Sequence, residues 1–278
     1  MWNLWCNMNI KIAQIGHGFV GKALSRSFSK KGHCTIIYDK YQEIGSPEDV
    51  LESDFLFLCL PTPYVEGHGF DLSAILENLK FLSNNKYAGL VILKSTVEPG
   101  TTELLNKQFK NLRMCHNPEF LTARTADEDF HNQTHIVLGH NEDWYDSYKE
   151  VLTLGAFFRE NYPNAKVSIC TSRESESMKL FSNSFYAMKV QIFNEFYLLC
   201  QRLGIDYERV KELMLSNEWI NPMHTVVPGP DGQISYGGAC FPKDTNALNH
   251  LMKTAGSPHE VLEACIRERN SMRDHKLK

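Results

Sequence analysis

Residues 11–24 read KIAQIGHGFVGKAL, an apolar run followed by three glycines and an amphipathic pattern. The apolar run predicts a buried strand over 11–15, and the pattern after it predicts a helix. Gly16 permits a tight turn between the two, Gly18 lets a ligand approach the backbone, and Gly21 lets helix and strand pack closely. This spacing of glycines is typical of a strand-turn-helix unit that binds a dinucleotide.

The first turn of the predicted helix contains Phe19 and Val20, where backbone N–H groups face an anion such as a pyrophosphate. A second apolar run, 34–38, ends at Asp39, about 20 residues further along the chain. A carboxylate at that place accepts hydrogen bonds from a ribose diol, and its charge repels a 2′-phosphate. The pattern therefore predicts an NAD site; the alternative is that the glycines only build a turn.

The composition excludes several classes of function. The chain has 278 residues, a net charge of -4 and 42% hydrophobic residues, which gives no basic surface for nucleic acid and enough apolar material for two cores. No segment approaches the roughly 18 apolar residues of a membrane span, and the first residues do not resemble a secretory signal. Its eight cysteines and eleven histidines show no metal-binding spacing. We expect a cytoplasmic protein without metal, nucleic-acid or membrane partners.

Apolar runs and helical patterns continue to alternate up to Thr171. The further predicted strands are 54–60, 90–96, 113–116, 135–140 and 166–170. The alternation predicts an α/β fold, a Rossmann-like doubly wound parallel sheet over residues 1–171. Ligands bind at the carboxyl ends of such strands, so Thr62, Ser95 and Thr96 are expected beside a nicotinamide. Strand termination and helix capping explain these polar residues equally well.

Residues 173–203 contain neither glycine nor proline and carry apolar residues at helical spacing. They predict one helix of roughly thirty residues, against a mean of about 11–12 in globular proteins. Such a helix can connect two domains and offer a surface for a homodimer. Glu176, Lys179 and Asn183 lie on one face of it, where Lys179 and Asn183 can both bond a developing oxyanion. The alternative is an exposed ion pair between Glu176 and Lys179.

Residues 237–244 read GGACFPKD and place Cys240 beside Gly237 and Gly238, four residues before Asp244. A thiol at a glycine turn, near a lysine and a carboxylate, has the surroundings of a covalent nucleophile. The segment belongs to a second predicted domain, 172–278. We expect that domain to be all-helical, with the long helix, the cysteine loop and two further helices over 244–254 and 259–272.

Six segments occur together and in order: 16–21, 62–63, 94–97, 117–121, 176–183 and 237–244. With these motifs the chain resembles the UDP-glucose/GDP-mannose dehydrogenase family of nucleotide-sugar oxidoreductases over nearly its whole length. The resemblance implies an NAD-dependent enzyme that oxidises the primary alcohol of a nucleotide sugar to a carboxylate in two hydride transfers. The leading reaction is the conversion of UDP-glucose to UDP-glucuronate.

The resemblance also implies roles for individual residues. Lys179, with a water near Thr96 and Asp244, would assist proton transfer in the first oxidation. Cys240 would then add to the aldehyde, and Lys179 and Asn183 would hold the oxyanion of the thiohemiacetal that becomes a thioester.

Hydrolysis of that thioester would use a water activated by Glu119 or Asp244. The family usually has a second glutamate four residues after the first, but here that position is Ala123. The residues that the resemblance places at the sugar nucleotide are Glu119, Phe120, Leu121, Lys179, Asn183, Gly237 and Gly238.

Two further departures concern substrate binding. The family's arginine upstream of the cysteine has no counterpart, since no arginine occurs between Arg209 and Arg267, and His224 is a candidate substitute. The family also continues for a further nucleotide-binding domain of about 100 residues, which we expect to be missing or supplied by a second chain. Two alternatives stay open: a two-electron phosphogluconate or hydroxyacid-type dehydrogenase, and a partner protein that binds NAD and a nucleotide sugar without turnover.

Overall fold

The computed structural model describes residues 10–142 and 145–273, and the chain forms two compact units. The first unit comprises Met1–Thr62 and Asp71–Met178, and the second comprises Pro63–Phe70 and Lys179–Lys278. Thr171, where the sequence pattern changes, is the last residue of strand β9. The long helix α6, Ser172–Leu203, begins in the first unit and continues into the second.

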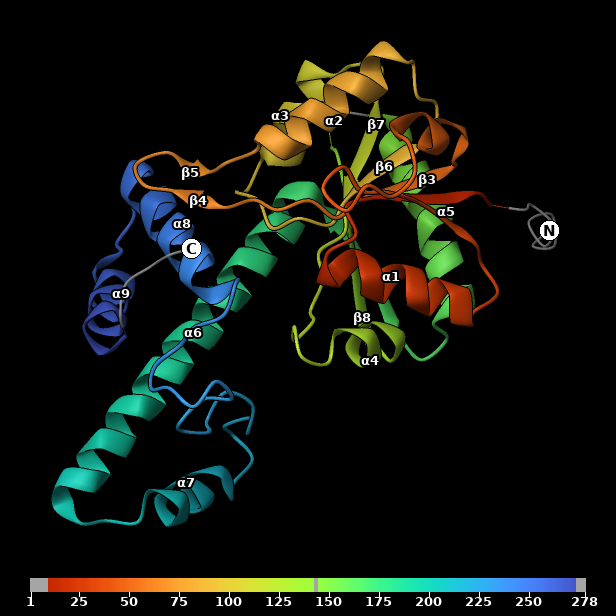
Figure 1. The fold of residues 1–278 in the computed structure, drawn as a ribbon. Helices are drawn as coiled ribbons and strands as arrows, with labels where there is room; N and C mark the ends of the chain where they lie inside the picture. The colour runs from red at the N-terminus through yellow and green to blue at the C-terminus, as the bar shows by residue number, and fades with distance from the viewer. Residues whose placement is uncertain (1–9, 143–144, 274–278) are drawn as a thin grey trace. The chain divides into compact units, whose positions relative to one another are not determined.

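The first unit is built around a seven-stranded sheet in the order β2-β1-β3-β6-β7-β8-β9 (Figure 1). Its strands are β1 (Ile12–Ile15), β2 (Thr35–Tyr38), β3 (Phe55–Leu58), β6 (Leu90–Leu93), β7 (Arg113–His116), β8 (His135–His140) and β9 (Lys166–Thr171). The first five run parallel, whereas β8 pairs with β7 in the antiparallel sense and β9 runs parallel to β8. The predicted Rossmann-like α/β class is confirmed. The sheet is mostly rather than wholly parallel, because β8 lies next to β7 and runs in the opposite direction.

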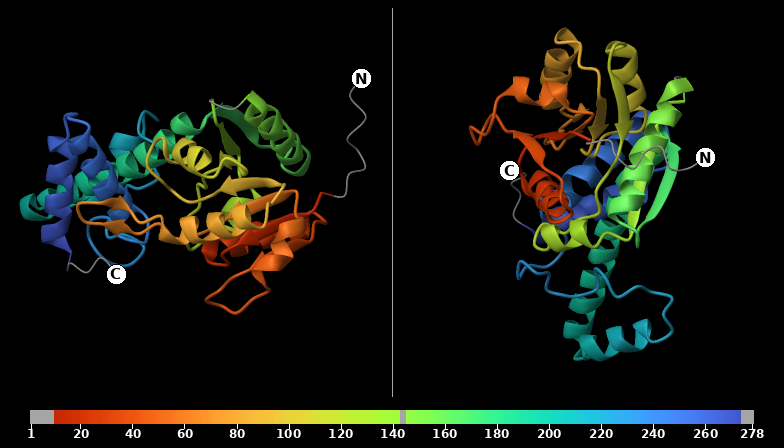
Figure 2. Two further views of the ribbon diagram at one scale, coloured as in Figure 1. Left: turned by 90° about the horizontal axis from the view of Figure 1, so that it is seen from above. Right: turned by 90° about the vertical axis from the view of Figure 1, so that its right-hand side faces the viewer.

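Helices cover both faces of this sheet, as Figures 1 and 2 show. One apolar core lies beneath α1 (Phe19–Lys30), α4 (Ala126–His131) and α5 (Tyr145–Asn161). The other lies beneath α2 (Ser73–Asn84), α3 (Thr101–Gln108) and the short 3-10 helix η1 (Pro47–Glu52). Alternate apolar residues of β1 and β3 point into opposite cores, which explains why both strands are buried along their whole length.

The second unit contains α7 (Tyr207–Leu215), α8 (Phe241–Thr254) and α9 (Glu260–Met272) beside most of α6. Gly204 adopts a φ of +66° after the last residue of α6, and the Asp206 carboxylate caps the first turn of α7. A small hairpin, β4 (Tyr64–Val65) and β5 (Gly69–Phe70), also packs against α8. Helix α7 and this hairpin were not expected from the sequence.

Candidate functional site

The glycine turn after β1 has the geometry of a dinucleotide site. Gly16 has a φ of +94°, and a methyl group added there would overlap the carbonyl oxygen of Cys59. A methyl group at Gly21 would overlap the carbonyl of Gly16, whereas one at Gly18 would meet nothing within 4 Å. Within the described residues no side chain caps α1, and its first turn carries no acidic residue. Its first N–H groups, from Phe19 onwards, can therefore receive an anion.

Asp39 follows β2, as predicted, and its carboxylate is held by backbone amides. It accepts hydrogen bonds from the N–H groups of His17 (2.6 Å), Tyr41 and Gln42 (both 2.9 Å). Burial tends to raise the pKa of Asp39, but these hydrogen bonds outweigh it and lower the pKa below the ordinary value. An ionised carboxylate at this edge fits the ribose of NAD and opposes a 2′-phosphate.

Thr62, Ser95 and Thr96 tie together the carboxyl ends of β3 and β6. The Thr62 hydroxyl donates to the backbone carbonyl of Thr96 (2.7 Å), and the Ser95 hydroxyl donates to that of Leu60 (2.6 Å). All three polar side chains are buried. Their observed bonds fix the loops at the sheet edge where a cofactor is expected.

The segment after β7 carries Glu119, Phe120 and Leu121. The Glu119 carboxylate accepts a 2.5 Å hydrogen bond from the backbone N–H of Leu121, and the Phe120 ring stacks on His135 at 6.0 Å. Lys94 anchors the start of this segment.

The buried Lys94 ammonium donates to the Asn117 side-chain oxygen (3.0 Å) and to the Pro118 carbonyl (3.3 Å). This lysine was not predicted as a site residue. Its place directly after the apolar strand β6 was the one sign in the sequence that it would be buried with polar partners.

Glu176 does not form the exposed ion pair that was one reading of the sequence. Its fully buried carboxylate accepts hydrogen bonds from the backbone N–H groups of Gly100 (2.6 Å) and Thr102 (2.8 Å), and from the Thr102 hydroxyl (2.5 Å). Burial raises the pKa of Glu176 to about 7, although these hydrogen bonds oppose the rise. The carboxylate thus caps α3 and anchors the first turns of α6.

In the second unit a chain of polar contacts joins three predicted catalytic residues. The Lys179 ammonium lies 3.4 Å from the side-chain oxygen of Asn183, and the Asn183 amide donates to the Asp244 carboxylate at 2.6 Å. Lys243 forms an ion pair with the other oxygen of that carboxylate at 2.5 Å. Lys179, Asn183 and Asp244 are all buried. Lys179 and Asn183 therefore contact each other on α6, as their spacing predicted, and Asn183 links them to the carboxylate of Asp244 on α8.

Cys240 occupies the N-cap position of α8, directly before Phe241 and Pro242. The N-terminus of a helix favours a thiolate over a thiol, because its unpaired N–H groups carry partial positive charge. The thiol is half-buried, and the preceding Gly238 has a φ of +78° in open space. Cys240 is therefore not part of the buried core.

His224 does not supply the charge of a missing arginine. Its ring lies between those of Tyr186 (4.9 Å) and Phe241 (5.5 Å). Burial, and then repulsion from Lys189, lower the pKa of His224 below the ordinary value of 6.5. The ring is therefore neutral at pH 7 and offers a hydrogen bond rather than a cation.

Comparison with known proteins identifies the family. Residues 42–153 match the NAD binding domain of the UDP-glucose/GDP-mannose dehydrogenase family, and residues 173–271 match its central domain. The chain belongs to this family, as its motifs predicted. NAD is therefore its cofactor, in agreement with the glycine turn and Asp39.

Individual relatives agree with this placement. The UDP-glucose 6-dehydrogenase AglM of Haloferax volcanii is 26% identical over 92% of this chain and 69% of its own length. A UDP-glucose 6-dehydrogenase of Pseudomonas aeruginosa is 30% identical over 81% of this chain and 50% of its own. The solved UDP-glucose dehydrogenase of Pyrobaculum islandicum superposes with a TM-score of 0.81 at 26% identity, over 94% of this chain and 68% of that one.

No helix among the described residues is long and apolar enough to cross a membrane. No cluster of three or more His, Cys, Asp or Glu side chains in the same part of the chain has the arrangement of a metal site.

Proposed function

We propose that the chain catalyses the NAD-dependent oxidation of a nucleotide sugar at its primary alcohol, with UDP-glucose as substrate and UDP-glucuronate as product. The observation that carries this proposal is Cys240 at the N-terminus of α8 in the same unit as the buried contacts among Lys179, Asn183 and Asp244. A thiol at a helix start and an ammonium held beside an amide are the groups that covalent aldehyde oxidation requires.

In the first oxidation the sugar C6 hydroxyl loses a proton and its carbon loses a hydride, which leaves an aldehyde. NAD, when bound, accepts the hydride in each of the two oxidations. Lys179 stabilises the developing alkoxide, and Asp244 accepts the proton through a water. The Asp244 carboxylate is buried and forms an ion pair with Lys243, which holds it in place for this step.

In the second oxidation the Cys240 thiolate adds to the aldehyde carbon and forms a thiohemiacetal. Lys179 and Asn183 bind its oxyanion, because both present N–H donors from one face of α6. Loss of the second hydride from that carbon gives a thioester. Water then attacks the thioester carbonyl, with Glu119 or Asp244 as general base, and the cysteine leaves as thiolate while the carboxylate is released.

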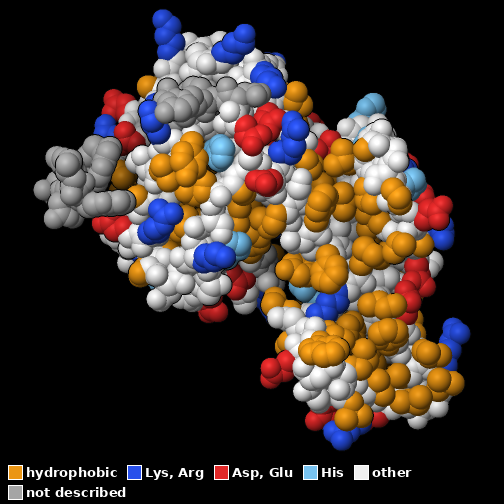
Figure 3. Space-filling model, turned by 180° about the vertical axis from the view of Figure 1, so that it is seen from behind, with side chains coloured by type: hydrophobic (Ala, Val, Ile, Leu, Met, Phe, Trp, Pro, Cys, Tyr) orange, Lys and Arg blue, Asp and Glu red, His pale blue; other side chains and the backbone are white. Residues whose placement is uncertain are grey.

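The long helix supports a proposed homodimer. Phe181, Phe185, Leu199 and Leu203 lie on the part of α6 that belongs to the second unit, and 52%, 63%, 53% and 62% of their respective surfaces are exposed. Their spacings of four, fourteen and four residues are compatible with one helix stripe. Hydrophobic side chains gather over this unit in Figure 3. An apolar stripe of this kind is suited to a second copy of the chain.

The stoichiometry of oxidation tests the proposed reaction. Wild-type protein is incubated with NAD and a panel of UDP- and GDP-sugars, and both NADH formed and sugar consumed are measured. We expect two NADH per molecule of UDP-glucose, and we expect Cys240→Ser to form one at most, with aldehyde accumulating. One NADH per sugar and free aldehyde from the wild type would favour the two-electron dehydrogenase. Binding by calorimetry without NADH would favour the partner protein without turnover.

A further inference from the structure

Arg273, directly after α9, is bound to the segment that leads into the cysteine turn. Its guanidinium donates to the backbone carbonyls of Ile234 (2.6 Å) and Ser235 (2.9 Å), and it pairs with both carboxylate oxygens of Asp231 (2.8 and 3.1 Å). Only 8% of its side chain is exposed. Its attraction lowers the pKa of Asp231, so the pair is ionised at neutral pH. A forked, buried guanidinium with two bonds to one carboxylate is held in a defined orientation.

The same segment is bound from both of its sides. Arg269 on α9 donates to the carbonyl of Tyr236 at 3.2 Å, so two arginines bind three successive carbonyls. From α6, Asn194 accepts from the backbone N–H of Ser235 at 2.8 Å, and Gln191 accepts from the Ser235 hydroxyl at 2.5 Å. Residues 234–236 are therefore fixed between α6 and α9.

Gly237 shows how closely Arg273 approaches this segment. A methyl group added at Gly237 would overlap the Nη1 atom of Arg273, and it would come within 3.2 Å of the Asp231 carboxylate. The φ of Gly237 is not in the left-handed region, so the backbone itself would accept an alanine. A side chain at residue 237 would therefore displace the Arg273 guanidinium from its place beside residues 234–235.

We propose that Arg273, oriented by Asp231, is a positioning residue that sets where the Cys240 thiol lies. The proposal rests on the proposed function, in which Cys240 is the nucleophile. Arg273 and Asp231 form a clamp on residues 234–235. The turn at Gly237 and Gly238 joins the fixed residues 234–236 at one end to the start of α8 at the other. Loss of the clamp frees that turn, and the thiol leaves the helix N-terminus that favours its reactive form.

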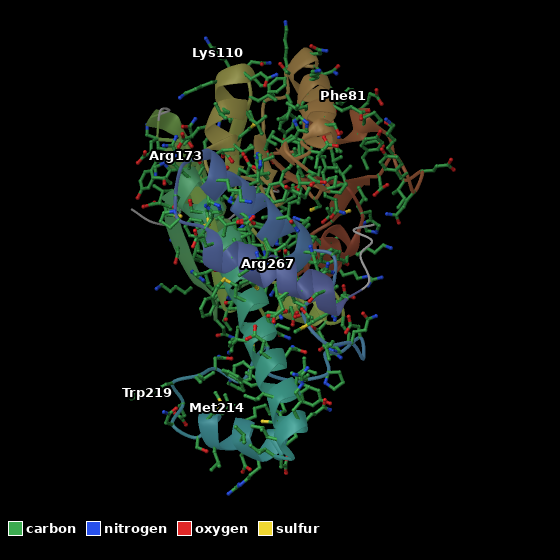
Figure 4. The ribbon with its side chains drawn as sticks, turned by 90° about the vertical axis from the view of Figure 1, so that its left-hand side faces the viewer. Phe81, Lys110, Arg173, Met214, Trp219 and Arg267 are labelled. Carbon is green, nitrogen blue, oxygen red and sulfur yellow. The ribbon has the colours of Figure 1, made fainter. Side chains whose placement is uncertain are left out.

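The test measures the thiol itself, not the dehydrogenase reaction. Each folded variant is treated with iodoacetamide at pH 7.5, and alkylation of the Cys240 peptide is followed by mass spectrometry. Arg273→Ala is expected to slow this alkylation by about 10-fold or more, and Arg273→Lys to restore part of the rate. Arg267→Ala is the matched control, because Arg267 is an exposed arginine of α9, labelled in Figure 4. The buried Cys200 must stay protected throughout, which excludes unfolding as the cause.

A second variant keeps the arginine and disturbs the clamp from the other side. Gly237→Ala is expected to slow the alkylation of Cys240 as Arg273→Ala does. The double variant is expected to be no slower than either single variant, because without the guanidinium the methyl group at residue 237 has nothing to displace. An unchanged or faster rate in Arg273→Ala, or additive effects in the double variant, would overturn the proposal. If the rates follow the expectation while the wild type oxidises no sugar, the proposed function fails and the positioning role stands.

Discussion

The side-chain amide of Asn183 on α6 donates a hydrogen bond of 2.6 Å to the carboxylate of Asp244 on α8. This bond fixes the orientation of the amide, so that its oxygen faces the Lys179 ammonium at 3.4 Å. Lys243 forms an ion pair with the other oxygen of the same carboxylate. Asn183, which is proposed to bind the oxyanion, therefore also donates a hydrogen bond to the fully buried carboxylate of Asp244.

Replacement of Asn183 by alanine should destabilise the second unit. The substitution removes one donor to the buried Asp244, and an unsatisfied buried group of this kind costs about 1–3 kcal/mol. Denaturation by urea, followed by circular dichroism, measures the loss. Asn85→Ala is the control, because the Asn85 side chain is exposed and bonds only a helix-end carbonyl. Equal stabilities of wild type and Asn183→Ala would show that the observed bond contributes nothing.

Substitution of Asp39 by asparagine should relax the choice of cofactor. Asparagine keeps one oxygen, which can accept from the Tyr41 and Gln42 amides, but it removes the acceptor of the His17 amide and the charge that opposes a 2′-phosphate. Affinity for NAD should fall by about tenfold, or roughly 1.4 kcal/mol, while the preference over NADP shrinks. Fluorescence titration of both cofactors checks this, with Asp71→Asn as a control elsewhere in the first unit. A preference for NAD that survives in Asp39→Asn would assign discrimination to other residues.

The stability of the fold should depend on the ionisation of Glu195. Its hydrogen bond to Glu268, followed by burial and the charge of Glu268, raises the pKa of Glu195 from 4.5 to about 7. The folded state therefore favours the protonated acid. This contribution is fully present below pH 4.5, falls as the pH rises from 4.5 to 7, and stays constant above that.

Replacement of Glu195 by glutamine isolates this effect from the similar titration of Glu176. The amide keeps a donor to Glu268 at every pH, so the variant should be more stable than the wild type at pH 8, where two carboxylates repel each other. The expected difference is only about 1 kcal/mol, because solvent screens part of this repulsion. The difference should vanish near pH 4.5. Thermal unfolding across this range decides the matter, and a stability difference that does not change with pH would be inconsistent with the raised pKa.

A charge on the apolar stripe of α6 should separate the proposed dimer. Phe185→Glu places a carboxylate on the proposed contact, where its desolvation opposes association. Sedimentation velocity should show a dimer for the wild type and a monomer for this variant. Val261→Glu, on the exposed side of α9, should leave the dimer intact. A wild-type monomer at all concentrations would refute the proposal directly.

Local patterns predicted most of the first unit because its strands are short runs rich in apolar residues and the turn after β1 carries glycine. All seven sheet strands and the long helix lie where the sequence placed them, to within a few residues. The direction of β8 was not predictable, since an apolar run has the same pattern in a parallel and an antiparallel pair. Helix α7 was missed, although Asp206 before an apolar pattern is a helix-start signal.

Contacts between distant residues account for what the sequence did not predict at the site. The spacing on α6 placed Lys179 and Asn183 together, but the cap that Glu176 provides to α3 joins residues 74 and 76 positions apart. The bonds from Arg273 to Asp231 cross 42 positions. Neither pairing has a local signature, because each depends on how helices pack rather than on helical or strand period.

The most direct test of the account asks whether a sugar becomes attached to Cys240. Wild-type protein is mixed with NAD and the C6 aldehyde of UDP-glucose, quenched in acid within one turnover and digested, and the cysteine peptides are weighed by mass spectrometry. The account predicts a thioester adduct on the Cys240 peptide alone, absent in Cys240→Ser. Formation of UDP-glucuronate with no adduct on Cys240, or with undiminished yield in Cys240→Ser, would contradict it.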